Sequence, residues 1–169
     1  MRAKDVLVDS LGRVREEVHA VVEGLPPGDL NARLDDRSNS ISWLVWHLTR
    51  IQDDHVAGAF GLDQLWTSEG WADRFALDLA VEDTGYAHTP RQVAEVRVDG
   101  GDLLLDHYDA VHERSLTCLH GLRAEDLDRV VDENWSPPVT LGVRLVSVVS
   151  DSLQHVGQAA FVRGVLSRR

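Results

Sequence analysis

The chain has 169 residues, of which 43% are hydrophobic, and this suits a single domain, residues 1–169, with a full core. Its formal net charge of −11 repels phosphate backbones and anionic lipid, so we expect neither nucleic acid nor a membrane as a partner. No apolar run is long enough to span a bilayer, and Asp5 and Asp9 stand where a secretory signal needs an apolar segment, so we expect a cytoplasmic protein.

Hydrophobic residues recur at helical spacing through the first sixty residues. An apolar stripe predicts a first helix from about Ala3 to Glu23, which Gly24 and the following prolines end. A polar connection follows, in which residues 29–34 allow one short helical turn. Ser40 is a favourable N-cap, so a second helix is predicted from there to about Ala59.

Residues 60–88 interrupt the helical pattern. Three glycines and two tryptophans, Trp66 and Trp71, stand there among acidic residues. A stretch of this length inside one domain is either disordered or functional, and the aromatic residues argue against disorder. We therefore expect an ordered crossover that covers a pocket.

A third helix is predicted to begin directly after the crossover. Thr89 and Gln92 form a capping box around a proline at the first helical position. The apolar stripe then continues to about Leu119. The pair Gly100 and Gly101 is expected to bend or interrupt this helix.

The last long helix follows a second connection, residues 120–138, in which residues 124–127 allow a helical turn. Thr140 caps this helix, which is predicted to end near Leu166. Four long amphipathic helices in one domain indicate an all-α fold, a four-helix bundle with a long crossover between helices 2 and 3.

Asp151 and His155 stand four residues apart in the last helix, so their side chains project from one face. A carboxylate and an imidazole suit zinc, nickel, iron or manganese, and one histidine from a facing helix would complete a three-ligand site with an open position. No lysine or arginine stands three or four positions from Asp151 to neutralise it. The alternative is that Asp151 lies at the bundle edge and His155 donates a single hydrogen bond in the core.

Two histidines of the second helix compete for the third position. His55 lies on the main apolar stripe, whereas His47 lies beside it, and spacing alone does not choose between them. Asp54 follows His47 by seven positions and shares its face, so it could accept a hydrogen bond from that imidazole, as ligating histidines require. The alternatives for Asp54 are a solvated acid and a pair with Arg50.

The segments SISWLVWHLTRIQDDHV and DSLQHVGQAAFVRGVL, with the long irregular crossover between them, resemble the DinB/YfiT-like superfamily of metal-binding four-helix bundles. The resemblance covers nearly the whole chain and is close to the branch that includes the N-terminal domain of mycothiol-dependent maleylpyruvate isomerase. It implies that His47, in the WHL motif, Asp151 and His155 bind a divalent metal, with zinc the first expectation and nickel or another transition metal the alternatives. Aspartate at 151 departs from the frequent histidine or glutamate, but it remains a competent oxygen ligand.

The same resemblance implies a chemistry. Members with known activity use the metal to activate a low-molecular-weight thiol, so the first hypothesis is a mycothiol-dependent S-transferase or isomerase with a metal-activated thiolate. The partners would be the thiol and a small-molecule substrate, and a homodimer is expected by analogy with relatives. The rivals are a metal-dependent hydrolase, with Asp54 or His55 as the nearest candidate general base, and a non-catalytic metal-binding stress-response protein.

Three further residues are candidates for contacts with the substrate or thiol. Trp66 in the crossover could form an apolar wall over the open coordination position, or it could only fasten the loop to the bundle. Gln158 lies one turn beyond His155. Arg163 lies about two turns beyond it and could meet only a long substrate such as a thiol with a sugar tail.

Overall fold

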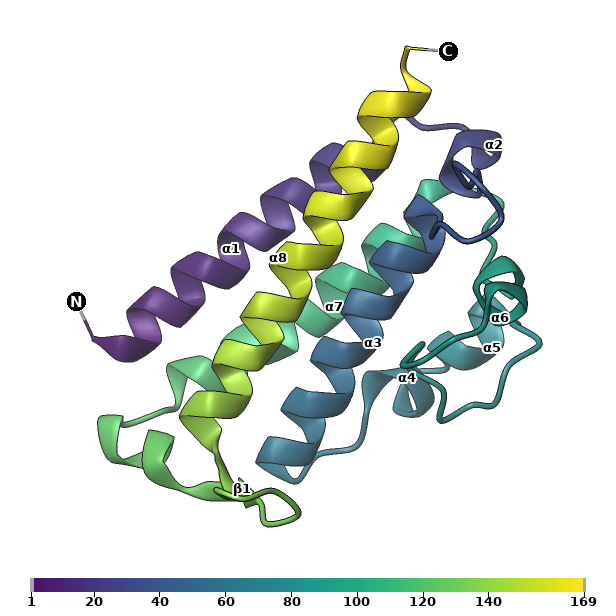
Figure 1. Cartoon of the computed structure of the whole chain (residues 1–169). Coiled ribbons are helices and arrows are strands. Elements are labelled where there is room, and N and C mark those ends of the chain that lie inside the picture. Colours follow the sequence, from purple (N-terminus) through teal and green to yellow (C-terminus); the bar gives the residue numbers. More distant parts are fainter. Residues whose placement is uncertain (1, 169) are drawn as a thin grey trace.

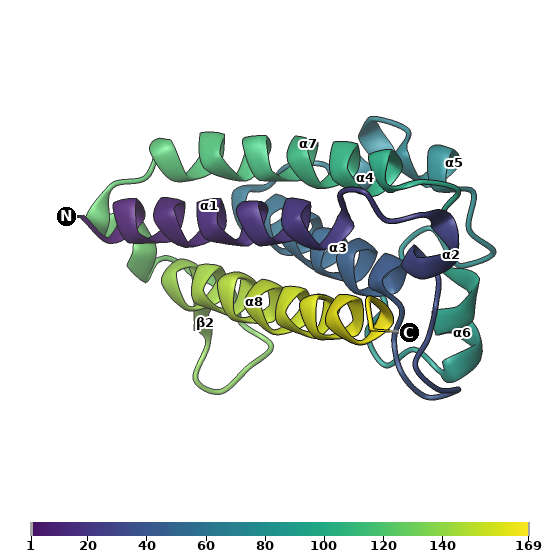
Figure 2. The same cartoon turned by 90° about the horizontal axis from the view of Figure 1, so that it is seen from above.

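Four long helices run side by side in the computed structural model, which describes residues 2–168 (Figure 1). They are α1 (Ala3–Val22), α3 (Ile41–Phe60), α7 (Gly101–His120) and α8 (Leu141–Leu166). α1 and α3 each pack against both α7 and α8, and α3 runs antiparallel to α8 (Figure 2). This confirms the predicted all-α four-helix bundle. None of the helices in residues 2–168 is long and apolar enough to cross a membrane.

The predicted helix starts are confirmed by their caps. The Ser40 hydroxyl accepts a hydrogen bond from the backbone N–H of Trp43 at 3.1 Å, and Thr140 caps α8 through the N–H of Val143 at 3.4 Å. At the other end of α3, Gly61 adopts a φ of 66°, a left-handed conformation that ends a helix at little cost for glycine.

The predicted third helix is divided in two. Its first part is the short α6 (Pro90–Glu95), which the predicted Thr89 capping box begins, and its second part is α7. The predicted interruption at Gly100 and Gly101 is confirmed, because α7 starts at Gly101 after extended backbone. A Cβ at residue 101 would lie 2.8 Å from Val22 Cγ1, so glycine allows this helix start to sit against the end of α1.

The crossover between α3 and α6 folds onto the bundle and contains α4 (Leu65–Ser68) and α5 (Trp71–Phe75). Trp66, Trp71 and Phe75 are all buried in the main hydrophobic core. The expectation of an ordered crossover is therefore confirmed, and the burial of its aromatic side chains explains why it is ordered. Before α3 there is a short helix, α2 (Pro27–Leu30), which lies earlier than the turn predicted for residues 29–34 and overlaps it only at residues 29 and 30.

A small hairpin between α7 and α8 was not predicted. A 3-10 turn (Ala124–Asp128) leads into strand β1 (Val130–Asp132), which pairs antiparallel with β2 (Val139–Thr140). Strands of three and two residues are too short to produce a recognisable alternation of apolar and polar residues.

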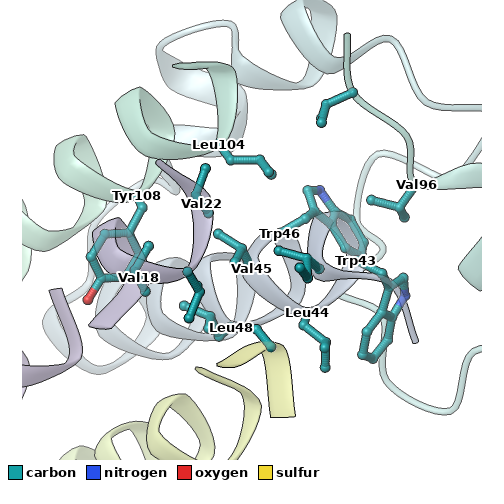
Figure 3. Packing of buried hydrophobic residues seen from close by; sticks show 14 of the residues in the cluster. Val18, Val22, Trp43, Leu44, Val45, Trp46, Leu48, Val96, Leu104 and Tyr108 are labelled. Carbon is teal, nitrogen blue, oxygen red and sulfur yellow. The ribbon is translucent and has the colours of Figure 1, made fainter. Parts of the chain in front are cut away.

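Helix α3 is the most enclosed of the four long helices. Every residue from Ser40 to Asp53 is buried, because α7, α8 and the crossover cover α3 on all sides. Figure 3 shows Val45 and Leu48 in the core with residues of α1 and α7, while Trp43 and Trp46 extend toward Val96. Polar side chains on this part of α3 therefore need partners inside the protein.

Candidate metal centre

Three side chains from α3 and α8 converge beside the crossover. Each of His47, Asp151 and His155 offers one ligand atom, and these atoms lie within 4.8 Å of one another. His47 Nε2 is 4.0 Å from Asp151 Oδ1, and the rings of His47 and His155 meet edge to face with centroids 4.6 Å apart. The structure thus brings together the three residues that the resemblance implied as metal ligands.

The hydrogen bonds of the two histidines define which ring nitrogen is free. His47 Nδ1 is 2.6 Å from the backbone oxygen of Thr84, and His155 Nδ1 is 2.9 Å from the backbone oxygen of Asp151. A carbonyl oxygen only accepts, so each Nδ1 carries the hydrogen, and Nε2 of each neutral ring keeps its lone pair. This is the arrangement that ligating histidines adopt.

The electrostatic environment of the cluster also suits a cation. Burial lowers the pKa of His47 and keeps its imidazole neutral, the form that binds metal. Burial acts in the same direction on His155, but its hydrogen bonds to Asp151 outweigh burial and raise its pKa. Asp151 Oδ2 is buried and lies 3.4 Å from His155 Nδ1, but the shorter hydrogen bond of that nitrogen goes to the Asp151 backbone oxygen at 2.9 Å. The carboxylate therefore keeps lone pairs for a cation, and a positive charge beside it would offset the cost of its burial. Two imidazole nitrogens and one carboxylate oxygen can therefore bind a divalent transition metal ion.

Trp43 of α3 and residues of the crossover form the wall behind His47. The Trp43 ring stacks on the His47 ring at a centroid distance of 4.6 Å and an interplanar angle of 11°. Trp43 Nε1 donates to His88 Nδ1 at 3.0 Å, and His88 Nε2 donates in turn to Asp83 Oδ1 at 2.9 Å. This chain of hydrogen bonds fastens the segment around Thr84 against α3.

A family model described as mycothiol-S-transferase matches residues 6–167. The chain belongs to the mycothiol-S-transferase family. This family lies within the DinB/YfiT-like superfamily, so the resemblance seen in the sequence is confirmed. The crystal structure of a conserved protein from Enterococcus faecalis is similar over 100% of this chain and 99% of that chain, with 32% identity and a TM-score of 0.93. No curated protein matches the chain.

A buried arginine, which the sequence suggested only as an alternative partner of Asp54, links the crossover to α3 in this mycothiol-S-transferase family member. Arg50 is 0% exposed, and its guanidinium donates to the Asp83 backbone oxygen at 3.3 Å and to Gln64 Oε1 at 2.8 Å. It lies 3.7 Å from the carboxylate of Asp53 and 4.7 Å from the centroid of the Trp66 ring. Desolvation lowers the pKa of Arg50 to about 10, so the side chain remains a cation near neutral pH.

Asp54 and His55 lie away from the metal cluster. His55 follows His47 by eight residues, or about 12 Å along the helix. Asp54 accepts a hydrogen bond from Gln64 at 2.7 Å, and His55 Nε2 is 3.5 Å from Arg144 Nη1. Both line a separate surface pocket of about 290 Å³. Of the alternatives for Asp54, the hydrogen bond to His47 is not formed, because the Thr84 carbonyl has that place. A general-base role for Asp54 or His55 stays a prediction.

The three candidate contact residues lie in different places. Trp66 is buried and donates through Nε1 to the Val81 oxygen at 2.8 Å, which fastens the crossover. Arg163 donates to the backbone oxygens of Val21 at 3.1 Å and Glu23 at 2.9 Å, at the end of α1. Gln158 is exposed, stands three residues after His155 on α8, and lines a cleft between α8 and the segment that leads into α3. Of the three, Gln158 is the one whose side chain is available to a ligand near the cluster.

Proposed function

We propose that this protein is a metal-dependent S-transferase that joins the sulfur of mycothiol to an electrophilic small molecule. The observation that carries the proposal is the convergence of His47, Asp151 and His155, with a buried carboxylate oxygen, in a chain of the mycothiol-S-transferase family. Its partners are then a thiol and a second small molecule. Zinc is the first expectation for the ion, because nitrogen and oxygen ligands from histidine and aspartate suit it.

The arrangement of the residues supports this chemistry. His47, Asp151 and His155 would hold a divalent ion, which would supply the positive charge that lowers the pKa of a thiol. In the transfer, the thiol proton would pass to solvent, the sulfur would form a bond to the electrophilic carbon, and the leaving group would depart with the bonding electrons. The protein contributes preorganisation, since the Thr84 carbonyl and the Trp43 ring fix the His47 imidazole before any ligand arrives.

Thiol consumption tests the proposal. Protein prepared without a histidine tag and loaded with zinc is incubated with mycothiol and a panel of electrophiles, while free thiol and products are measured. The wild type and the control His55→Ala should consume thiol and form the thioether, whereas His155→Ala should not. Equal consumption by wild type and His155→Ala contradicts the proposal. Hydrolysis of an electrophile without loss of thiol would favour the hydrolase hypothesis instead.

A further inference from the structure

A cleft of about 490 Å³ lies between the second half of α8 and the segment that leads into α3. Gln154, Gln158 and Phe161 line it from α8, and Ser38 and Asn39 line it from the other side. Leu44 and Val162 also contribute to the lining, and both are buried.

Two residues that line the cleft stand about one helical turn from the candidate metal ligands. Leu44 precedes His47 by three residues on α3, and Gln158 follows His155 by three residues on α8. Because α3 and α8 are antiparallel, these two steps lead in the same direction along the bundle. Three helical residues rise about 4.5 Å, so a molecule in the cleft ends within roughly one helical turn of the cluster.

The chemistry of the lining is neutral and mixed. Charged residues make up 27% of the chain, yet every residue that lines this cleft is uncharged. The side-chain amides of Asn39, Gln154 and Gln158 can each donate and accept hydrogen bonds, as hydroxyl groups require. Phe161 is 66% exposed, and its ring offers an apolar surface. Amides beside an exposed aromatic ring suit a sugar, which has hydroxyl groups at its edge and C–H groups on its faces.

We propose that this cleft binds the uncharged, hydroxyl-rich part of the low-molecular-weight thiol and so directs its sulfur toward His47, Asp151 and His155. The inference rests on the proposed function, and it names the part of the co-substrate that the protein recognises. An ion held by His47, Asp151 and His155 would act on the sulfur, while Gln158 and Phe161 would distinguish a sugar-bearing thiol from a simple one.

Gly157 provides a variant that fills the cleft. A Cβ at residue 157 would meet no atom within 4 Å, so a larger side chain projects into open space. Leucine also favours an α-helix over glycine, and Gly157→Leu should therefore fold. Gly12→Leu in α1 is the matched control, because a Cβ there also meets nothing within 4 Å and residue 12 lies outside the cleft.

Two measurements then test the inference. In the first, KM and kcat are measured for mycothiol and for N-acetylcysteine, which lacks the sugar. Gly157→Leu should raise KM for mycothiol about tenfold or more with little change in kcat, and it should leave N-acetylcysteine unaffected. Gly12→Leu should change neither thiol. An unchanged mycothiol KM in Gly157→Leu, or an equal loss with both thiols, overturns the inference.

In the second measurement, binding of the sulfur-free N-acetylglucosaminyl-inositol fragment, which carries no charge, is followed by calorimetry, which needs no turnover. If the fragment binds to wild type and Gly12→Leu, and at least tenfold more weakly to Gly157→Leu, the result supports binding of the sugar in the cleft. This holds even if no thiol is consumed, in which case the proposed function alone fails. Absence of binding to wild type overturns the inference while the transferase proposal stands. Sedimentation tests whether a second copy of the chain covers the cleft. A wild-type dimer that Gly157→Leu converts to a monomer would show this and would overturn the inference.

Discussion

The backbone of Gly85 lies directly against the ring of His47. A Cβ at residue 85 would be 2.7 Å from His47 Nδ1, 3.0 Å from a Trp46 ring carbon and 3.1 Å from a Trp43 ring carbon. Gly85 also adopts a φ of 91°, a conformation that side-chain-bearing residues rarely take. Glycine at this position lets the neighbouring Thr84 carbonyl reach the histidine, so the crossover forms part of the candidate metal centre.

Gly85→Ala is expected to weaken metal binding. The added methyl group must push the crossover from His47, which removes the hydrogen bond to Thr84 that orients the imidazole, and such a loss typically costs ten- to a hundredfold in metal affinity. Alanine at residue 85 would also have to adopt the positive φ of Gly85, and this strain should lower the free energy of unfolding by about 1–3 kcal/mol. Chelator competition measures the affinity and urea unfolding of the metal-free protein measures the stability. Gly12→Ala, which meets no atom, is the control, and wild-type affinity in Gly85→Ala would contradict the role given to the crossover.

Arg50→Met should destabilise the protein strongly. The substitution leaves the carboxylate of Asp53 buried without Arg50, and it deletes the hydrogen bonds to Gln64 and the Asp83 carbonyl. Removing one partner of a buried pair costs about 3–5 kcal/mol, although the remaining pair between Asp53 and Arg114 should place the loss at the lower end. Urea unfolding measures the change. Arg13→Met, which breaks an exposed pair with Asp9, should change stability by no more than about 0.5 kcal/mol, and an equal effect of both substitutions would count against this account.

His107 should make the protein less stable in mild acid. The side chain is 1% exposed among Trp66, Trp71 and Phe75, and burial lowers its pKa from 6.5 to about 3. His107 therefore binds a proton below about pH 6.5 in the unfolded chain, but in the folded chain it does so only near pH 3. The contribution of neutral, buried His107 to the free energy of unfolding is fully present above pH 6.5. It is lost progressively as the pH falls toward 3, by up to about 1.4 kcal/mol per pH unit.

The comparison of His107→Leu with wild type isolates this contribution. Between pH 6 and pH 4.5, the free energy of unfolding of the variant should fall less steeply than that of wild type, by about 1.4 kcal/mol per pH unit. His120→Leu is the control, because His120 is exposed and meets solvent in both states. Parallel curves for wild type and His107→Leu would show that His107 does not titrate as its burial requires.

Much of the bundle could be predicted from sequence because its signals are local. The apolar stripes and the caps at Ser40, Thr89 and Thr140 specify the starts of their helices to within one residue. The hairpin near Val130 carries no comparable signal. The spacing of Asp151 and His155 also predicted correctly that they share a helix face, since that relationship lies within one turn.

The rest of the candidate site depends on contacts between distant segments. Periodicity placed His55 on the inward stripe, yet His47 is the more deeply buried histidine, because the crossover packs over its side of α3. The same cover explains why Arg50 and Asp53 are buried although charged residues usually mark a solvent face. No pattern within α3 reveals that Thr84, 37 residues later, provides the hydrogen-bond acceptor for His47.

Metal stoichiometry tests the central claim most directly. Untagged wild type and the variants His47→Ala, Asp151→Ala, His155→Ala and His55→Ala are reconstituted with zinc or nickel, freed of excess ion, and analysed by mass spectrometry of the elements. Wild type and His55→Ala should retain about one ion per chain, and the other three variants should retain little, because each removes one of three protein ligands. Wild type that retains no ion, or full occupancy in Asp151→Ala, would contradict a metal centre built from His47, Asp151 and His155.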